Sequence, residues 1–125
     1  MTIIDSSVLI ALAIKNDSQH EKAIQVLSEV ADSAQVPNAV LVEAAGVLWE
    51  MLQDAEFLGQ WCQQVSERFQ IVCEQPEVIQ HSIERYFRQA DRFSLVDCQL
   101  IEWNKSLGFD VLSFDDAVNR ELQRA

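Results

Sequence analysis

Four acidic residues, spaced far apart along this chain, each border apolar residues that could hold them against a folded core. They are Asp5, Glu43, Asp97 and Asp115. If a fold brings them together, their carboxylates repel one another and lose water, so a cation must offset the charge. A site with only oxygen ligands favours Mg²⁺ or Mn²⁺. The pattern therefore predicts a divalent-metal site, and the chemistry it would support is metal-assisted cleavage of a phosphodiester.

Three of these acids could instead be helix caps. Asp5 and Asp115 each precede a predicted helix, and aspartate is among the preferred N-cap residues. Asp97 follows Ser94 by three positions, which is close to a capping box. Asp116 would favour the dipole of the last helix. The sequence alone leaves both interpretations of these residues open.

Glu43 is harder to explain in this way. On a helix, its neighbours three and four positions away are small or apolar: Ala39, Val40, Gly46 and Val47. A carboxylate on that face is costly to bury unless another group supplies positive charge. The small neighbours also leave room above it for an ion or a phosphate.

Short apolar strands alternate with amphipathic helices along the chain. We expect extended segments over residues 2–5, 35–37, 69–73 and 110–114, and helices over residues 6–14, 18–30, 39–52, 54–68, 76–92, 94–107 and 116–124, with Ser18 as one N-cap. This order predicts a three-layer α/β/α sandwich with a central, mostly parallel sheet of about four to five strands. Ligands bind beyond the carboxyl ends of such strands, which is where Asp5 and Asp115 fall.

The composition fits one cytoplasmic domain over residues 1–125. The chain has 49% hydrophobic residues, three Gly and two Pro, and no apolar stretch long enough to cross a bilayer. Its first residues lack the charged region and cleavage site of a signal peptide. The three cysteines are odd in number and lack CxxC spacing, which predicts buried free thiols in a reducing compartment.

All four acids stand in short motifs that follow one another in a definite order. The motifs are Ile4-Asp5-Ser6, Val42-Glu43-Ala44, Asp97 with Gly108 after it, and Ser113-Phe114-Asp115. Together they resemble the PIN-domain family, in particular its small VapC-like ribonucleases, over essentially the whole chain. The last motif usually contains Thr, and Ser113 keeps the hydroxyl at that place.

The resemblance implies an Mg²⁺- or Mn²⁺-dependent endoribonuclease with a PIN-like fold. Its catalytic, metal-binding residues would be Asp5, Glu43, Asp97 and Asp115, with Asp116 as a further ligand, and with Ser6 and Ser113 orienting the carboxylates. It also implies a homodimer, for which the helices over residues 21–30 and 54–68 offer apolar surface. In a toxin–antitoxin pair, a small antitoxin would insert an Arg among the acids.

RNA contact has one candidate surface on the helix over residues 76–92. Ile79, Ile83, Tyr86, Phe87 and Ala90 form its apolar stripe, and Arg85, Arg88 and Arg92 lie on the opposite face. Such a face is more often simply solvated, but clustered basic residues also mark phosphate contacts. The formal net charge of −11 argues against tight non-specific binding of nucleic acid.

Two other classes of function remain open. A PIN-like scaffold with weak or no nuclease activity could act as a binding module through protein contacts, which the acidic balance favours and the four carboxylates oppose. A phosphoacceptor domain of the receiver type also has an acidic pocket on a parallel sheet. That class needs paired early acids and a mid-chain aspartate at a strand end, whereas Asp5 stands alone and Glu43 lies on a predicted helix.

Overall fold

Four parallel strands form the centre of the protein in a computed structural model that describes residues 1–89 and 92–124. Along the chain the strands are β1 (Thr2–Ile4), β2 (Ala34–Pro37), β3 (Gln70–Val72) and β4 (Asp110–Leu112), and in the sheet their order is β3-β2-β1-β4. Strands β1, β3 and β4 are shorter than expected and β2 is one residue longer, but all four lie where the sequence predicts. The expected parallel sheet is confirmed.

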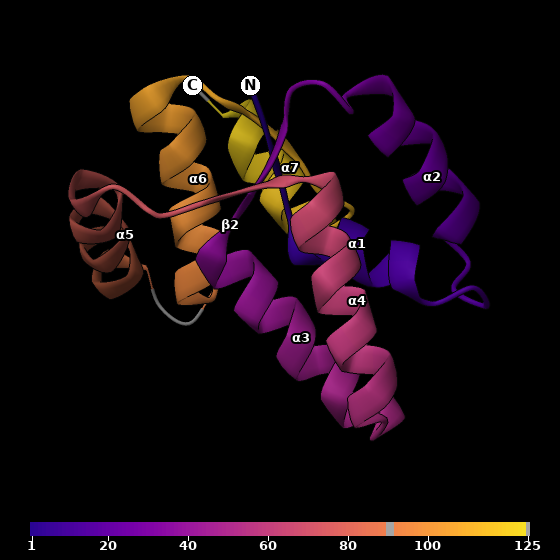
Figure 1. Cartoon of the computed structure of the whole chain (residues 1–125). Helices are drawn as coiled ribbons and strands as arrows, with labels where there is room; N and C mark the ends of the chain where they lie inside the picture. The colour runs from indigo at the N-terminus through magenta and orange to yellow at the C-terminus, as the bar shows by residue number, and fades with distance from the viewer. Residues whose placement is uncertain (90–91, 125) are drawn as a thin grey trace.

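Seven helices connect and cover the strands. They are α1 (Ser6–Ala13), α2 (His20–Glu29), α3 (Asn38–Leu52), α4 (Ala55–Arg68), α5 (Pro76–Arg88), α6 (Leu95–Leu107) and α7 (Asp116–Gln123), counted over the described residues. Figure 1 shows α5 and α6 on one side of the sheet and α1, α2 and α4 on the other, which gives the predicted three-layer α/β/α sandwich.

The direction in which successive strands are added across the sheet reverses between β3 and β4, although all four strands are parallel. From β1 it moves outward through β2 to β3, and then α5 and α6 carry it back to the opposite side of β1. Strands β1 and β4 are therefore neighbours whose connections lie on opposite faces of the sheet. Open parallel sheets bind ligands at such a switch point, beyond the carboxyl ends of the strands.

The core explains why β1 is central. Ile3, Ile4 and Val36 are fully buried, as expected for strands covered on both faces. Helix α1 adds Val8 and Leu9, which are also fully buried. This packing fixes the end of β1, and with it the position of Asp5.

No helix in the described part of the chain is long and apolar enough to cross a membrane.

Several local predictions were wrong. Helix α5 ends at Arg88 and does not continue to Arg92, and helix α2 begins at His20 without a cap from Ser18. The Gln19 backbone N–H is bound instead by the Asp17 side chain, at 2.7 Å. The cysteines are free, but only Cys98 is buried, whereas Cys62 is half-buried and Cys73 is exposed.

The apolar stripe of α5 faces solvent. Ile79, Ile83 and Tyr86 are each about two-fifths exposed, and Phe87 is 81% exposed. Ala90, the last predicted member of the stripe, lies outside the described residues. The inward face of α5 carries Val78 and Ser82 instead, and Arg85 lies between this face and solvent.

The apolar surface expected on two other helices is largely used within the monomer. Trp61 and Val65 of α4 are buried, as are Ala23 and Leu27 of α2, while Phe57 and Leu58 are half-buried against the core. Ile24 of α2 remains 50% exposed, and most of the other exposed apolar side chains lie on α5 and along α3, where Val42 is 62% exposed.

Candidate functional site

Asp5 lies at the carboxyl end of β1, at the switch point of the sheet. Ile4 pairs with Leu112 of β4, and the Asp5 backbone N–H extends this pairing by donating to the Leu112 carbonyl at 2.9 Å. The next residue of each strand follows in register, so Asp5 lies opposite Ser113. The Asp5 side chain is 3% exposed and therefore has to be satisfied by protein groups.

Three serines, Ser6, Ser7 and Ser113, donate hydrogen bonds to the Asp5 carboxylate, and the longest of these contacts is from Ser6 Oγ to Oδ1 at 3.4 Å. The Ser6 backbone N–H donates to Oδ1 at 2.6 Å, which is the predicted cap of α1. Ser113 Oγ donates to Oδ2 at 2.6 Å, and Ser7 Oγ donates to the same oxygen at 3.0 Å. Sequence reasoning selected Ser113 and missed Ser7. The available signal was the second hydroxyl in the run Asp5-Ser6-Ser7.

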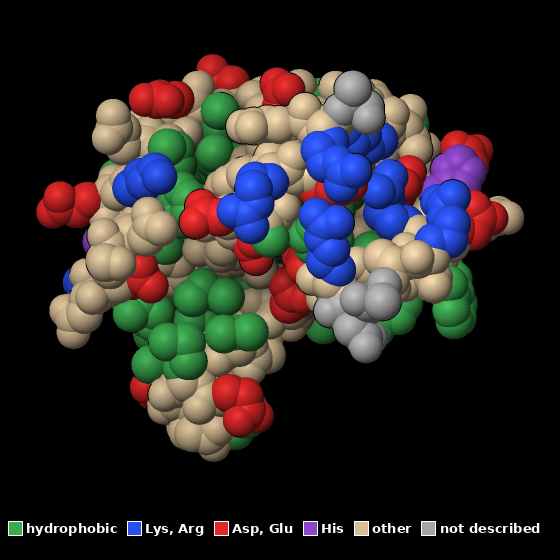
Figure 2. Space-filling model, turned by 180° about the vertical axis from the view of Figure 1, so that it is seen from behind, with side chains coloured by type: hydrophobic (Ala, Val, Ile, Leu, Met, Phe, Trp, Pro, Cys, Tyr) green, Lys and Arg blue, Asp and Glu red, His purple; other side chains and the backbone are tan. Residues whose placement is uncertain are grey.

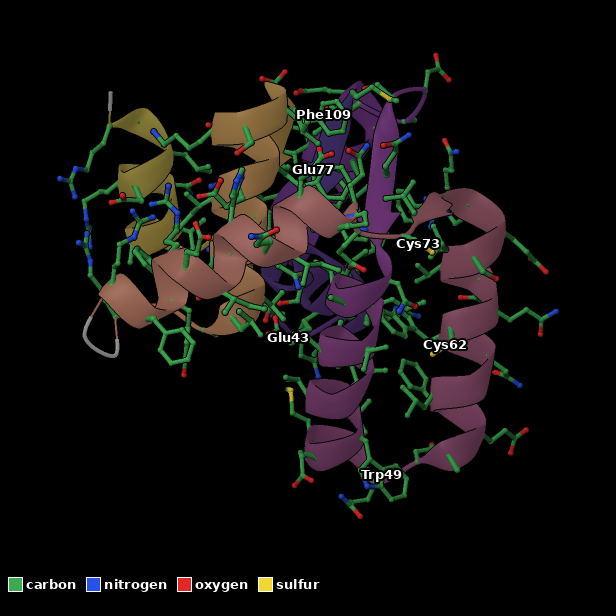
Figure 3. The ribbon with its side chains drawn as sticks, turned by 90° about the vertical axis from the view of Figure 1, so that its left-hand side faces the viewer. Glu43, Trp49, Cys62, Cys73, Glu77 and Phe109 are labelled. Carbon is green, nitrogen blue, oxygen red and sulfur yellow. The ribbon has the colours of Figure 1, made fainter. Side chains whose placement is uncertain are left out.

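Glu43 reaches the same region from helix α3. Figure 3 shows it in the first turns of α3, where this helix approaches the pair formed by α5 and α6. Its side chain is half-buried, and Oε1 accepts a hydrogen bond of 2.6 Å from Ser6 Oγ. Ser6 therefore contacts both carboxylates: its backbone N–H binds Asp5 and its hydroxyl binds Glu43.

Asp97 lies at the start of α6 and closes a capping box there. Ser94 Oγ accepts a bond from the Asp97 N–H at 3.1 Å, and Asp97 Oδ2 accepts one from the Ser94 N–H at 3.3 Å. Burial, together with the charges of Asp5 and Glu43, raises the pKa of Asp97 to about 6, against the lowering effect of the Ser94 bonds. The structure thus brings three of the four predicted acids into one electrostatic site.

Asp115 is joined to this group through Ser113. The Asp115 N–H donates to Ser113 Oγ at 3.0 Å, and that hydroxyl in turn donates to Asp5. Asp115 also caps α7, since its Oδ1 accepts from the N–H groups of Ala117 and Val118. Its side chain is exposed, as is that of Asp116 in the first turn of the helix.

The described residues offer these carboxylates no cationic partner. None of the ion pairs among residues 1–89 and 92–124 includes Asp5, Glu43 or Asp97. Within the same residues, no group of three or more His, Cys, Asp or Glu side chains is arranged to hold a metal ion directly. A half-buried cluster of carboxylates without a counter-charge nevertheless fits a divalent cation, because its charge is what the site lacks.

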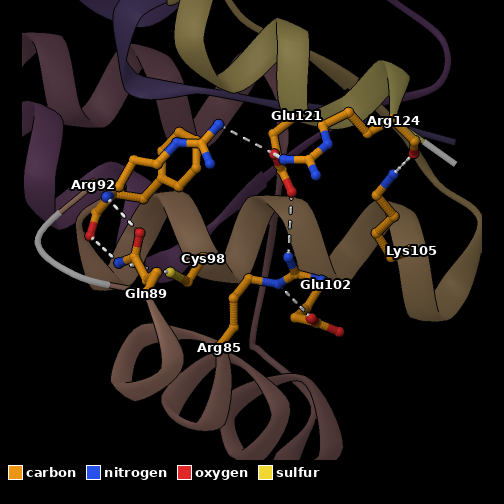
Figure 4. A network of polar contacts seen from close by, with 9 residues as sticks. Arg85, Gln89, Arg92, Cys98, Glu102, Lys105, Glu121 and Arg124 are labelled. Carbon is orange, nitrogen blue, oxygen red and sulfur yellow. Dashed lines mark hydrogen bonds and ion pairs between the residues drawn. The ribbon is translucent and has the colours of Figure 1, made fainter.

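The candidate RNA contacts on α5 have different surroundings (Figure 4). Arg85 Nε donates to Glu102 Oε1 at 2.7 Å, and its Nη1 lies 3.6 Å from Glu121 Oε1. Arg92 pairs with Glu121 Oε2 at 3.5 Å, as Arg124 does at 3.1 Å. Arg88 is exposed and belongs to none of the ion pairs found in the described residues.

Glu102 is a buried carboxylate that sequence reasoning missed. Burial alone would raise its pKa, but hydrogen bonds from Ser106 and Arg85, together with the charge of Arg85, outweigh burial and lower it. The pair Arg85–Glu102 therefore attaches α5 to α6, while Glu121 extends the network to α7.

Six of the nine Lys and Arg residues lie between residues 85 and 124, and Figure 2 shows Lys and Arg side chains, in blue, gathered over one part of the surface.

An open, parallel α/β/α sandwich with carboxylates gathered at its switch point describes the class of this protein. The chain belongs to the PIN-domain family, whose model matches residues 2–121. The match and the four-stranded fold together confirm the family that the sequence motifs indicate.

Solved structures share this fold at low sequence identity. VapC20 of Mycobacterium tuberculosis, described as a toxin that cleaves the sarcin-ricin loop, aligns with a TM-score of 0.81 and 18% identity over 96% of this chain and 94% of that chain. PAE2754 of Pyrobaculum aerophilum aligns with a TM-score of 0.68 and 17% identity over 99% of this chain and 86% of that chain. A comparison with curated protein sequences gave no significant match.

Proposed function

We propose that this protein is a divalent-metal-dependent endoribonuclease that uses Mg²⁺ or Mn²⁺ to hydrolyse RNA phosphodiester bonds. The observation that carries the proposal is the convergence of Asp5, Glu43 and Asp97 from three separate elements at the carboxyl edge of the sheet. In the described part of the chain, none of the three pairs with a Lys, Arg or His side chain. A fold that only needed helix caps would gain nothing from placing these charges within reach of one another.

The hydrogen bonds distinguish the occupied carboxylate oxygens from those available to a metal. Oδ2 of Asp5 already accepts two hydroxyl bonds. Oδ1 accepts the Ser6 N–H at 2.6 Å and lies 3.4 Å from Ser6 Oγ, whose single proton has a shorter bond of 2.6 Å to Glu43. Glu43 uses Oε1 and Asp97 uses Oδ2 in the described hydrogen bonds, which leaves Glu43 Oε2 and Asp97 Oδ1 for coordination. Mg²⁺ typically keeps several waters and binds few carboxylates directly, so part of the coordination would pass through water.

Each residue then has a distinct role in the proposed reaction. A bound divalent ion would supply an activated water and would stabilise the charge on the leaving oxygen. The ion would be bound and positioned by Asp5, Glu43 and Asp97. On the exposed side of the site, Asp115, with Asp116 beside it, completes the acidic edge. Ser6 and Ser113 hold the carboxylates in place.

The expected RNA contacts change in the light of the ion pairs. Arg85 is engaged with Glu102, and Arg92 with Glu121, so their charges are partly neutralised. Arg88 is exposed on the same helix and is the stronger candidate of the three for a phosphate contact. The similarity to VapC20 supports a structured RNA, and the sarcin-ricin loop is a reasonable first substrate to test.

The decisive assay is cleavage of a labelled sarcin-ricin hairpin and of total RNA with Mg²⁺, with Mn²⁺ and with chelator. Asp5→Asn and Asp97→Asn should abolish metal-dependent cleavage, while Asp32→Asn, which removes an exposed acid of equal charge, should not. Cleavage that persists in chelator, or in both site variants, would contradict the proposal.

A binding module without nuclease activity is the second candidate. It is favoured by the net charge of −11 and by the ion pairs that partly neutralise Arg85 and Arg92, both of which weaken attraction to RNA. Calorimetric titration separates the two candidates: a module has no need of the acidic site and would bind no Mg²⁺ or Mn²⁺ at millimolar concentration.

The proposed partners follow from the same family. A homodimer has more apolar surface available on α5, through Ile79, Ile83, Tyr86 and Phe87, than on the helices α2 and α4 that the sequence suggested. If the protein is a toxin in the cytoplasm, a small antitoxin would have to cover the acidic site, most simply with an Arg. A neighbouring gene for a short DNA-binding protein with a basic tail would support that role.

A further inference from the structure

Ser7 joins two parts of the acidic site that are far apart in sequence. It is the second residue of α1, and its hydroxyl donates to Asp5 Oδ2 at 3.0 Å. Ser7 Oγ in turn accepts a hydrogen bond of 2.9 Å from the backbone N–H of Phe114, 107 residues further along the chain. Ser7 therefore links the carboxyl end of β1 to the segment between β4 and α7, which carries Ser113 and Asp115.

A serine near a helix N-terminus often satisfies a nearby backbone group and has no further role. Ser7 differs, because neither of its bonds is to the backbone of its own helix. One bond is to a side chain that precedes the helix, and the other is to a distant strand end. Ser7 is half-buried, so water competes only partly for these bonds.

The hydrogen-bonding capacity of the serines limits how they can be arranged. A serine hydroxyl has a single proton to donate. Ser7 and Ser113 each donate that proton to Asp5 Oδ2, and each accepts a backbone N–H, from Phe114 and Asp115 respectively. Their two Oγ atoms lie 3.5 Å apart. Two hydroxyls thus saturate Asp5 Oδ2. The other oxygen, Oδ1, accepts only the Ser6 N–H at short distance, because the Ser6 hydroxyl, 3.4 Å away, has its shorter bond to Glu43.

We infer that Ser7 is a positioning residue for the metal site: with Ser113 it fixes the rotamer of Asp5, so that Oδ1 alone is presented to the cation. The inference rests on the proposed function. It adds that Asp5 acts as a monodentate ligand whose direction is set by two hydroxyls, one from each side of the switch point. Removing either hydroxyl leaves Oδ2 with a single hydroxyl donor, which allows the carboxylate to rotate.

The test is Mn²⁺ binding by calorimetry on the whole chain, with RNA cleavage measured on the same samples. Ser7→Ala should weaken Mn²⁺ binding by about 10-fold or more, the usual effect of losing a group that orients a ligand. Ser7→Thr keeps the hydroxyl and should restore most of the affinity. Ser82→Ala is the matched control, since Ser82 is fully buried on α5 and bonds only within its own helix.

A double-variant cycle identifies the shared oxygen. Because Ser7 and Ser113 donate to the same atom, the effects of Ser7→Ala and Ser113→Ala on Mn²⁺ affinity should not add. A merely structural serine would lower the melting temperature and leave the Mn²⁺ dissociation constant unchanged, which would overturn the inference. So would additive effects in the cycle, or failure of Ser7→Thr to restore affinity.

The outcomes also separate this inference from the proposed function. Wild-type protein that binds Mn²⁺ but cleaves no RNA refutes the nuclease and still tests Ser7 through its effect on binding. Wild-type protein that cleaves RNA, with Ser7→Ala binding Mn²⁺ equally well, refutes only the role of Ser7. Wild-type protein that binds no Mn²⁺ at millimolar concentration refutes both.

Discussion

The metal-free protein should become less stable as pH rises, and Asp97 should account for a measurable part of that loss. Burial and the charges of Asp5 and Glu43 raise the pKa of Asp97 from an ordinary value of 3.8 to about 6 in the folded protein. The folded state therefore holds a proton that the unfolded chain has already released. The stabilisation from that proton is complete below about pH 4 and is lost as pH rises through about 6.

The magnitude follows from the size of the change in pKa. The full difference between the folded and unfolded values corresponds to at most about 3 kcal/mol, and only part of this falls in the accessible pH range. Between about pH 5 and about pH 7.5, and allowing for solvent screening at a half-buried carboxyl, we expect a loss of about 1 kcal/mol. The contribution of Asp97 to this loss should therefore level off above about pH 7.

Asp97→Asn removes the titrating group and keeps an oxygen that can accept the Ser94 N–H. In urea unfolding with chelator present, the free energy of unfolding of the variant minus that of the wild type should grow by about 1 kcal/mol from about pH 5 to about pH 7.5. Asp32→Asn, at an exposed position, should show no such trend. A difference for Asp97→Asn that stays constant with pH, or that shrinks, would refute the electrostatic site.

Three further predictions concern the helices around the site. Arg85→Ala leaves the carboxylate of Glu102 buried without its partner and should lower the free energy of unfolding by about 3 kcal/mol in urea titrations, whereas the exposed Arg88→Ala should change it by less than about 0.5 kcal/mol. Phe87→Ser should leave monomer stability unchanged but weaken self-association in analytical ultracentrifugation, because this side chain is 81% exposed. Gly108→Ala should lower the free energy of unfolding by about 1 kcal/mol in urea titrations. Gly108 ends α6 with φ of 72°, which strains an L side chain, while no neighbouring atom obstructs a Cβ.

The parallel sheet and its acidic edge were predictable because they depend on local signals. An apolar strand that ends in Asp5, and a helix whose acid Glu43 has only small and apolar neighbours, are visible in the sequence. The capping predictions for Asp5, Asp97 and Asp115 are confirmed for the same reason, since a cap involves only residues within a few positions. Element ends were less accurate, and strands β1, β3 and β4 in particular are shorter than the segments predicted for them.

The orientation of α5 was not predictable from its own sequence. Hydrophobic periodicity places the most apolar face inward, which would bury Ile83 and Phe87. The inward face instead carries Val78 and Ser82, and Arg85 beside them pairs with the buried carboxylate of Glu102 on α6. That partner is 17 residues away along the chain, so the periodicity of α5 alone does not reveal it. The role of Ser7 was hidden in the same way, because its partner Phe114 becomes its neighbour only through the pairing of β1 with β4.

Capping and metal binding are compatible at these positions, and the structure shows why. A cap uses one carboxylate oxygen: Asp97 Oδ2 accepts the Ser94 N–H, and Asp115 Oδ1 accepts the first N–H groups of α7. The second oxygen of each group is left for another partner. In a parallel sheet, a helix that begins just after a strand has its N-terminus at the carboxyl edge. Capping therefore brings aspartates to the edge where ligands bind. Burial and, to a smaller extent, repulsion from Asp5 and Glu43 raise the pKa of Asp97, and a cation would relieve this cost.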